Sequence, residues 1–201
     1  MIIVRTPLRI SIAGGGTDIP QRRSKHGCMF ISAAIDKYIY ITFHESLYAK
    51  SIRARYSKME EVNSLEEIKN EILRETLRYY HKTSGMEITS HADIPTRTGL
   101  GSSGSFAVAL VGAIAKAKKL NKSLGEIAAE AWDIEVNRLG WYGGKQDQYA
   151  AVMGGLNIMY FDRDSVLIKA FPRELTQKLH KYLLLVYTSG ERKSRLIQRK
   201  F

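Results

Sequence analysis

The sequence predicts an α+β fold, in which pairs of strands and packed helices share one core. Two observations support this class. Runs of β-branched and aromatic residues, which are typical of strands, occur in pairs at 28–44 and 155–171. The segment 106–115 is apolar on every side, so we expect it to form a buried helix. Strands and helices are mixed without regular alternation, which favours α+β over a parallel α/β sheet.

The individual elements follow from local patterns along the chain. Pro7 interrupts the first pair of short strands, and a tight turn at Asp36-Lys37 predicts a hairpin. Ser64 and Ser123 each open a capping box, which predicts a helix after each of them. The expected strands are 2–5, 8–12, 28–35, 38–44, 51–56, 86–92, 155–161, 166–171 and 182–188, and the expected helices begin at Leu65, Phe106, Leu124 and Arg173.

Length and composition limit the class of protein. The 201 residues suffice for one sizeable core, or for one domain and part of another. Cys28 is the only cysteine, which excludes an internal disulfide and a cysteine-built metal site. No stretch approaches the roughly 20 apolar residues of a membrane span. The N-terminus lacks the apolar core of a signal peptide. We therefore expect a cytoplasmic protein with no membrane partner.

The net charge of +11 suits an anionic partner, or merely serves solubility. One basic cluster consists of Arg22, Arg23 and Lys25, and a second lies within 191–200. A groove for nucleic acid would interleave basic residues with aromatic ones, and neither cluster does so. A phosphorylated small molecule explains the charge equally well, so charge alone does not decide between these partners.

A glycine- and serine-rich turn at 95–105 directly precedes the buried helix. The first turn of that helix offers free backbone N–H groups and the positive end of the helix dipole, which suits a phosphate. The alternative is a tight loop before a core helix. The turn lacks the lysine of a Walker motif. It matches Gly-x-Gly-x-x-Gly, but a second helix follows where a dinucleotide site needs a strand.

Two carboxylates stand out after this helix. Glu135 continues the apolar stripe that includes Ile127 and Ala131, and a carboxylate on such a face is costly unless it is paired or binds a metal. The alternative is that the helix ends there and Glu135 pairs with Arg138. Asp147 either serves as a base or caps the helix that follows it.

Three blocks, at 7–18, 95–104 and 143–148, together resemble the GHMP small-molecule kinases, which include galactokinase and the homoserine, mevalonate and phosphomevalonate kinases. The Gly-Gly-Gly-Thr-Asp sequence at 14–18 looks most like the D-glycero-D-manno-heptose 7-phosphate kinases. The resemblance implies a GHMP N-terminal ATP-binding domain at 1–172, with a ribosomal-protein-like two-layer arrangement of sheet and helices. It implies that 173–201 begin a C-terminal domain that is incomplete here.

The resemblance also implies a role for each matching residue. Asp147 would orient or deprotonate the attacking hydroxyl, and Arg9 would lie near the transferred phosphoryl group. Ser103 and Glu135 would bind Mg²⁺, which takes few protein ligands and keeps its waters. The residues expected to bind nucleotide are Gly99, Leu100, Gly101, Ser102, Ser103, Gly104 and Ser105. The residues expected to bind substrate are Gly16, Thr17, Asp18, Gly144, Lys145 and Gln146.

The implied activity is transfer of phosphate from ATP, with Mg²⁺, to the anomeric hydroxyl of a sugar phosphate such as D-glycero-D-manno-heptose 7-phosphate. A hypothetical basic set drawn from Arg22, Arg23, Lys25, Arg97 and Lys145 would hold the sugar's own phosphate. The alternatives are a fucose or galactose kinase, or a truncated, inactive nucleotide- or RNA-binding domain. A homodimer is left open. Because relatives carry a third glycine-rich motif that we do not find here, activity of these 201 residues by themselves is left open too.

Overall fold

The structure, a computed structural model, describes residues 1–18, 27–46, 48–162 and 165–187. Its strands are β1 (Ile2–Ala13), β2 (Cys28–Glu45), β3 (Ile52–Arg55), β4 (Met59–Val62), β5 (Met86–Ala92), β6 (Leu156–Phe161) and β7 (Val166–Ala170). Its helices are α1 (Glu71–Tyr79), α2 (Ser102–Ala117), α3 (Leu124–Asp133), α4 (Gln146–Met153) and α5 (Arg173–His180), with a short 3-10 helix η1 (Leu65–Glu67) and a π-helical turn η2 (Ile134–Arg138).

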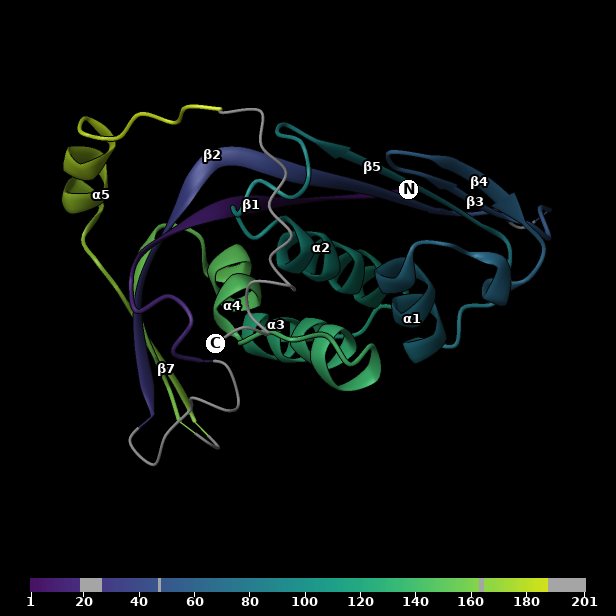
Figure 1. Ribbon diagram of the computed structural model, residues 1–201. Coiled ribbons are helices and arrows are strands. Elements are labelled where there is room, and N and C mark those ends of the chain that lie inside the picture. The colour runs from purple at the N-terminus through teal and green to yellow at the C-terminus, as the bar shows by residue number, and fades with distance from the viewer. Residues whose placement is uncertain (19–26, 47, 163–164, 188–201) are drawn as a thin grey trace.

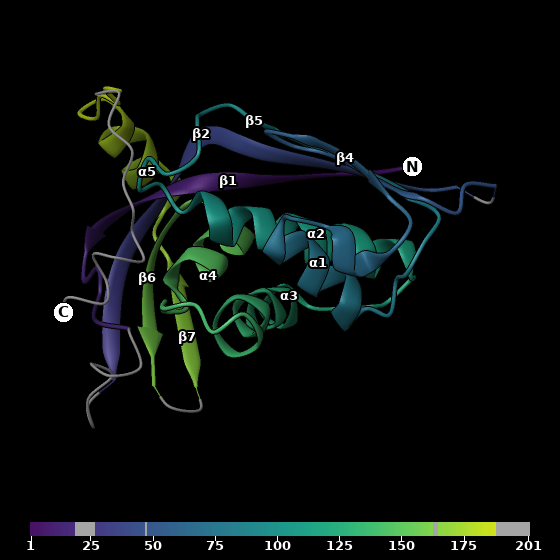
Figure 2. The same cartoon turned by 45° about the vertical axis from the view of Figure 1, so that its right-hand side comes forward.

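The seven strands form a single sheet, and α1 to α4 cover one of its faces (Figure 1). The path through the sheet is β4-β3-β5-β2-β6-β7, and β1 also pairs with β2. Figure 2 shows that β6 and β7 run down beside the helices, while α5 lies apart from the helical layer. The expected α+β class is confirmed.

The long strand β2 replaces the expected hairpin, which was wrong. No turn occurs at Asp36-Lys37, because β2 runs through these residues and pairs with other strands on both sides of them. β1 pairs with it over most of its length. β5 pairs with its second part, 39–45, and β6 with its first part, 28–33. Backbone pairing with three different strands therefore keeps this segment as one continuous, curved strand, where local sequence suggested a hairpin (Figure 1).

The strand β1 is also continuous, although two strands interrupted at Pro7 were expected. Its register against β2 shifts between Pro7 and Arg9, so the proline, which has no N–H to donate, sits at an irregularity in the ladder. The Pro7 carbonyl there accepts a hydrogen bond of 2.9 Å from the Ser105 hydroxyl. The Thr6 hydroxyl in turn donates to the Ser105 carbonyl at 2.9 Å. The irregularity thus ties β1 to the first turn of α2.

The helix α2 forms the centre of the core, as its apolar sequence predicted. It contacts β1 and β2 on one side and α1, α3 and α4 on the others. Its fully buried side chains include Leu110, Val111 and Ile114. A helix enclosed in this way has no solvent-facing stripe, which explains why its sequence has no polar face.

Two other expectations need correction. Ser64 caps only the 3-10 helix η1, and α1 begins later, with Asn70 as its cap. The segment 182–187 forms no strand, and its side chains are exposed. A strand needs a neighbour for its backbone groups, and none of the described strands pairs with this segment. None of the helices in the described part of the chain is long and apolar enough to cross a bilayer.

Candidate active site

An ion pair between Arg9 of β1 and Asp147 of α4 lies at the centre of the candidate site. The Arg9 Nε and Nη2 atoms both donate to Oδ1 of Asp147, at 2.8 and 2.6 Å. Arg9 also donates from Nη1 to the Gly99 carbonyl at 2.9 Å, and from its backbone N–H to the Leu100 carbonyl at 3.1 Å. Through Arg9, the first, second and third sequence blocks therefore meet at one place.

The first turns of α2 and α4 pack closely against each other at this place. A Cβ atom added to Gly104 would lie 2.7 Å from the Cβ of Asp147, closer than van der Waals contact allows. Gly101 has a φ of 75° and faces the Arg9 side chain, which a Cβ there would meet at 3.2 Å. Glycine at 104 thus lets α4 approach until Asp147 stands beside the start of α2.

The backbone at the start of α2 lacks a side-chain cap within the described part of the chain. Gly101 is the N-cap residue of this helix. The amide groups of the first turn therefore need water or an anion. Ser103 is exposed and Ser102 half-buried, whereas the Ser105 hydroxyl is occupied by Pro7. Binding of nucleotide here stays a prediction.

Glu135 faces the interior, as its place on the apolar stripe predicted, with only 3% of its surface exposed. The helix does not end before it, because η2 continues α3 with a π-type bond from the Leu139 N–H to the Ile134 carbonyl. Gly140, with a φ of 65°, then ends the turn. The Glu135 Oε2 atom accepts a hydrogen bond of 2.6 Å from Nε2 of Gln148 in α4. Insertions of this π type often occur at functional sites.

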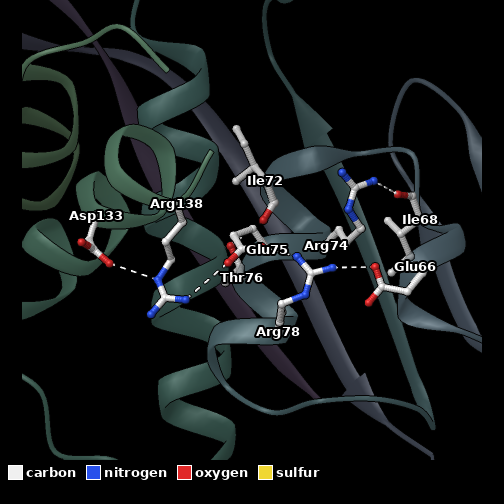
Figure 3. A network of polar contacts seen from close by, with 9 residues as sticks. All are labelled: Glu66, Ile68, Ile72, Arg74, Glu75, Thr76, Arg78, Asp133 and Arg138. Carbon is white, nitrogen blue, oxygen red and sulfur yellow. Dashed lines mark hydrogen bonds and ion pairs between the residues drawn. The ribbon is translucent and has the colours of Figure 1, made fainter. Parts of the chain in front are cut away.

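Ion pairs of Arg138 connect η2 to the neighbouring helices α3 and α1. Arg138 donates to Asp133 at 3.1 Å and to Glu75 of α1 at 3.4 Å (Figure 3). Glu75 also binds Arg78, which in turn pairs with Glu66. The network joins α1 to the turn that carries Glu135.

The oxygen donors of Glu135 and Ser103 suit Mg²⁺, which prefers oxygen ligands and needs few of them from protein. The described residues hold no cluster of three or more His, Cys, Asp or Glu side chains that could bind a metal ion. A site of one carboxylate and one hydroxyl is consistent with that finding. The joint role of the two residues as metal ligands stays a prediction.

Asp18 is buried beside the start of α4, with 5% of its surface exposed. Its Oδ2 accepts a hydrogen bond of 2.9 Å from the Gln146 backbone N–H, and a Cβ on Gly144 would lie 1.8 Å from its carboxyl group. Burial raises the pKa of Asp18, backbone hydrogen bonds partly offset this, and the charge of Asp147 raises it further. The Gln146 side chain donates to the Ser11 hydroxyl at 2.8 Å. The absence of a side chain at Gly144 therefore makes room for the Asp18 carboxyl group beside the start of α4.

The other residues expected to bind substrate lie around this contact. Thr17 folds back on the Gly14 carbonyl, to which its hydroxyl donates at 2.8 Å, and Gly16 has a φ of 83°. The Lys145 ammonium lies 4.8 Å from the centre of the Trp132 ring. Contact of these residues with a sugar stays a prediction. Arg22, Arg23, Lys25 and the basic stretch 191–200 lie outside the described residues.

Sequence reasoning missed Ser11 and Gln148 as parts of this site. Gln148 directly follows Asp147, but its partner Glu135 lies on another helix, so the pairing arises only when α3 and α4 pack. Ser11 belongs to the first block, yet a lone serine in a strand carries no signal of its own. Both are found only from tertiary contacts.

Comparison with known proteins identifies the class. Residues 66–155 match the family model of the GHMP kinases N terminal domain. This stretch contains α2, Glu135, Asp147 and the glycine-rich turn. Residues 66–155 therefore belong to a GHMP kinase N-terminal domain, and the expected resemblance to this family is confirmed.

Individual relatives can be named next. The chain is 34% identical over 176 residues to D-glycero-alpha-D-manno-heptose 7-phosphate kinase of Campylobacter jejuni, covering 80% of this chain and 50% of that protein. It is 31% identical over 136 residues to mevalonate kinase of Methanothermobacter thermautotrophicus, covering 66% and 43%. Its structure is similar to that of a D-glycero-D-manno-heptose 1-phosphate kinase from Bacteroides thetaiotaomicron, with a TM-score of 0.80, 28% identity and coverage of 89% and 63%. The chain spans about half the length of the curated relatives it matches.

Proposed function

We propose that this chain takes part in phosphoryl transfer from ATP to a hydroxyl of a sugar phosphate, with D-glycero-D-manno-heptose 7-phosphate as the leading substrate. The observation that carries the proposal is the Arg9–Asp147 pair, which joins the acid of the third block to the glycine-rich turn of the second. The two relatives named as heptose phosphate kinases support the substrate class.

The geometry suits a reaction that depends on positioning. Phosphoryl transfer passes through a loose transition state, so correct placement and neutralisation of charge supply most of the catalysis. Arg9 binds Oδ1 of Asp147, which fixes the carboxylate while its second oxygen accepts the proton of the attacking hydroxyl. The guanidinium of Arg9 then stands beside the phosphoryl group as it moves.

The remaining roles follow from the neighbouring elements. The amide groups at the start of α2 hold the phosphates of ATP, and Glu135 and Ser103 hold Mg²⁺. When bound, the magnesium ion neutralises charge on the transferred phosphate. The sugar binds against the residues Asp18, Thr17, Gly16 and Gln146. Its phosphate group binds to Lys145 or Arg97.

An activity assay with a substrate panel tests the proposal. We expect ATP turnover with heptose 7-phosphate and little with galactose, fucose, mevalonate or RNA. Asp147→Asn keeps the shape of the carboxylate but cannot take a proton, so the rate should fall about 10² to 10⁴-fold. Asp36→Asn changes an exposed carboxylate on β2 and should have no effect.

Each failure has a distinct meaning. Turnover with a different sugar and none with the heptose would keep the kinase and reject the substrate. An Asp147→Asn variant as fast as the wild-type chain would reject Asp147 as the base. Binding of RNA without ATP turnover would replace the kinase by the RNA-binding alternative.

A further inference from the structure

Gln148 is a buried polar residue to which the proposed mechanism gives no role. Only 4% of its surface is exposed, and it lies on α4 directly after Asp147. Its Nε2 atom donates to Oε2 of Glu135 at 2.6 Å. Its Oε1 atom is buried too, and within the described part of the chain it accepts no hydrogen bond.

The direction of this amide follows from its partner. A carboxylate offers only acceptors, so the NH₂ group must face Glu135; the reverse orientation would set two oxygen atoms against each other. The amide oxygen of Gln148 therefore points away from Glu135. A buried acceptor without a donor is costly, and such groups call for a ligand or a functional reason.

A neutral donor is also the right partner for a carboxylate that binds a cation. An arginine or lysine in this place would add a positive charge beside Glu135, whereas the amide of Gln148 holds one carboxylate oxygen and carries no charge itself. Partners of this kind commonly orient the residues that bind a metal.

We infer that Gln148 is a positioning residue for Glu135. It fixes Oε2 so that the other carboxylate oxygen is presented to the metal, and its own Oε1 accepts a hydrogen bond from a water of the metal's hydration shell. The inference rests on the proposed function. Gln148 and Asp147 are neighbours on α4. The residue that orients Glu135 and the proposed base therefore move together.

Binding of Mn²⁺ in place of Mg²⁺ tests this without catalysis. Electron paramagnetic resonance measures Mn²⁺ affinity in the presence of a saturating non-hydrolysable ATP analogue. Gln148→Met keeps the length of the side chain and removes both polar atoms, so we expect Mn²⁺ to bind about 10- to 100-fold more weakly. Gln148→Ala should show the same direction if the methionine variant folds poorly.

A double-variant comparison shows whether Gln148 acts through Glu135. In a Glu135→Gln background the same Gln148→Met change should alter Mn²⁺ affinity by less than about twofold, since the carboxylate to be positioned is gone. In the active chain, Gln148→Met should raise the Mg²⁺ concentration for half-maximal rate and leave kcat nearly intact at saturating Mg²⁺. A merely structural role would not separate these two quantities.

Asn157→Leu provides the matched control. Asn157 is equally buried, and its amide donates to the Gly154 carbonyl and not to a carboxylate. This variant should melt at a lower temperature and bind Mn²⁺ as the wild-type chain does.

Two results would overturn the inference alone. The first is unchanged Mn²⁺ affinity in folded Gln148→Met, and the second is a loss of affinity that persists in full without the Glu135 carboxylate. If the wild-type chain bound no Mn²⁺ together with nucleotide, the proposed function would fail, and the inference with it.

Discussion

The carboxylate of Asp18 lies where the glycine loop of the first block meets the start of α4. It is buried, it accepts the backbone N–H of Gln146, and the lack of a side chain at Gly144 makes room for it. Its burial raises its pKa above the ordinary value of 3.8, although the backbone hydrogen bonds oppose this shift. A residue matched to sugar binding is thus also an anchor for the helix that carries Asp147.

The raised pKa predicts a dependence of stability on pH. The folded chain binds the Asp18 proton more tightly than the unfolded chain does, so the contribution of Asp18 to stability decreases as pH rises from 3.8 through the raised pKa. The amide of an Asp18→Asn variant does not ionise. The free energy of unfolding of this variant, minus that of the wild type, should therefore increase as pH rises across this window. Urea unfolding at a series of pH values measures the difference. Glu174→Gln, an exposed change on α5, is the control, and a pH-independent difference would contradict the prediction.

Gly104 shows a second constraint on a single residue. We expect Gly104→Ala to lower the free energy of unfolding by about 1 to 3 kcal/mol, because its Cβ would collide with Asp147 and push apart α2 and α4. Turnover should fall too, since Asp147 is displaced. Gly112→Ala lies on the same helix, where its Cβ would meet Val4 at an ordinary 3.8 Å. That control should be neutral or stabilise by up to about 1 kcal/mol, and equal effects of both changes would contradict the packing argument.

Among the elements, η2 is joined to a distant helix through its last residue, Arg138. Its π-type bond shifts the following residues relative to an α-helix, and Arg138 at its end reaches across to Glu75 on α1. The carboxylate of Glu75 is nearly buried, and it receives Arg78 and Arg138 from two different elements (Figure 3). Because Glu75 pairs with both Arg78 and Arg138, it keeps one cationic partner when either arginine is removed.

This arrangement predicts non-additive changes in stability. Arg78→Ala and Arg138→Ala are each expected to cost less than about 1 kcal/mol, because both guanidinium groups are partly exposed and the other still pairs with Glu75. The double variant leaves a nearly buried carboxylate unpaired, so its cost should exceed the sum by about 1 kcal/mol or more. Urea unfolding measures all three variants. Adding Glu75→Gln to the double variant should restore part of the loss, and simple additivity would refute the prediction.

At the scale of the whole molecule, sequence alone predicted those features that local patterns determine. The capping box at Ser123 does begin α3, and the apolar run after Gly104 does form the central helix α2. The inward face of Glu135 was also predictable, because it continues a stripe on its own helix. The expected hairpin was wrong because the partners of β2 come from distant parts of the chain. The contact of Gln148 with Glu135 was out of reach for the same reason.

The partners of β2 also set an order for assembly during synthesis. β1 and β5 precede α2 in the chain, so the second part of β2 can pair as soon as residue 92 has left the ribosome. The first part, 28–33, must wait for β6 on its other edge until residue 161 has emerged. Phe30, whose side chain ends fully buried against Phe161, stays uncovered during this interval. The nascent chain therefore carries an open, apolar strand edge until β6 is made, and an edge of this kind is prone to pair with other chains.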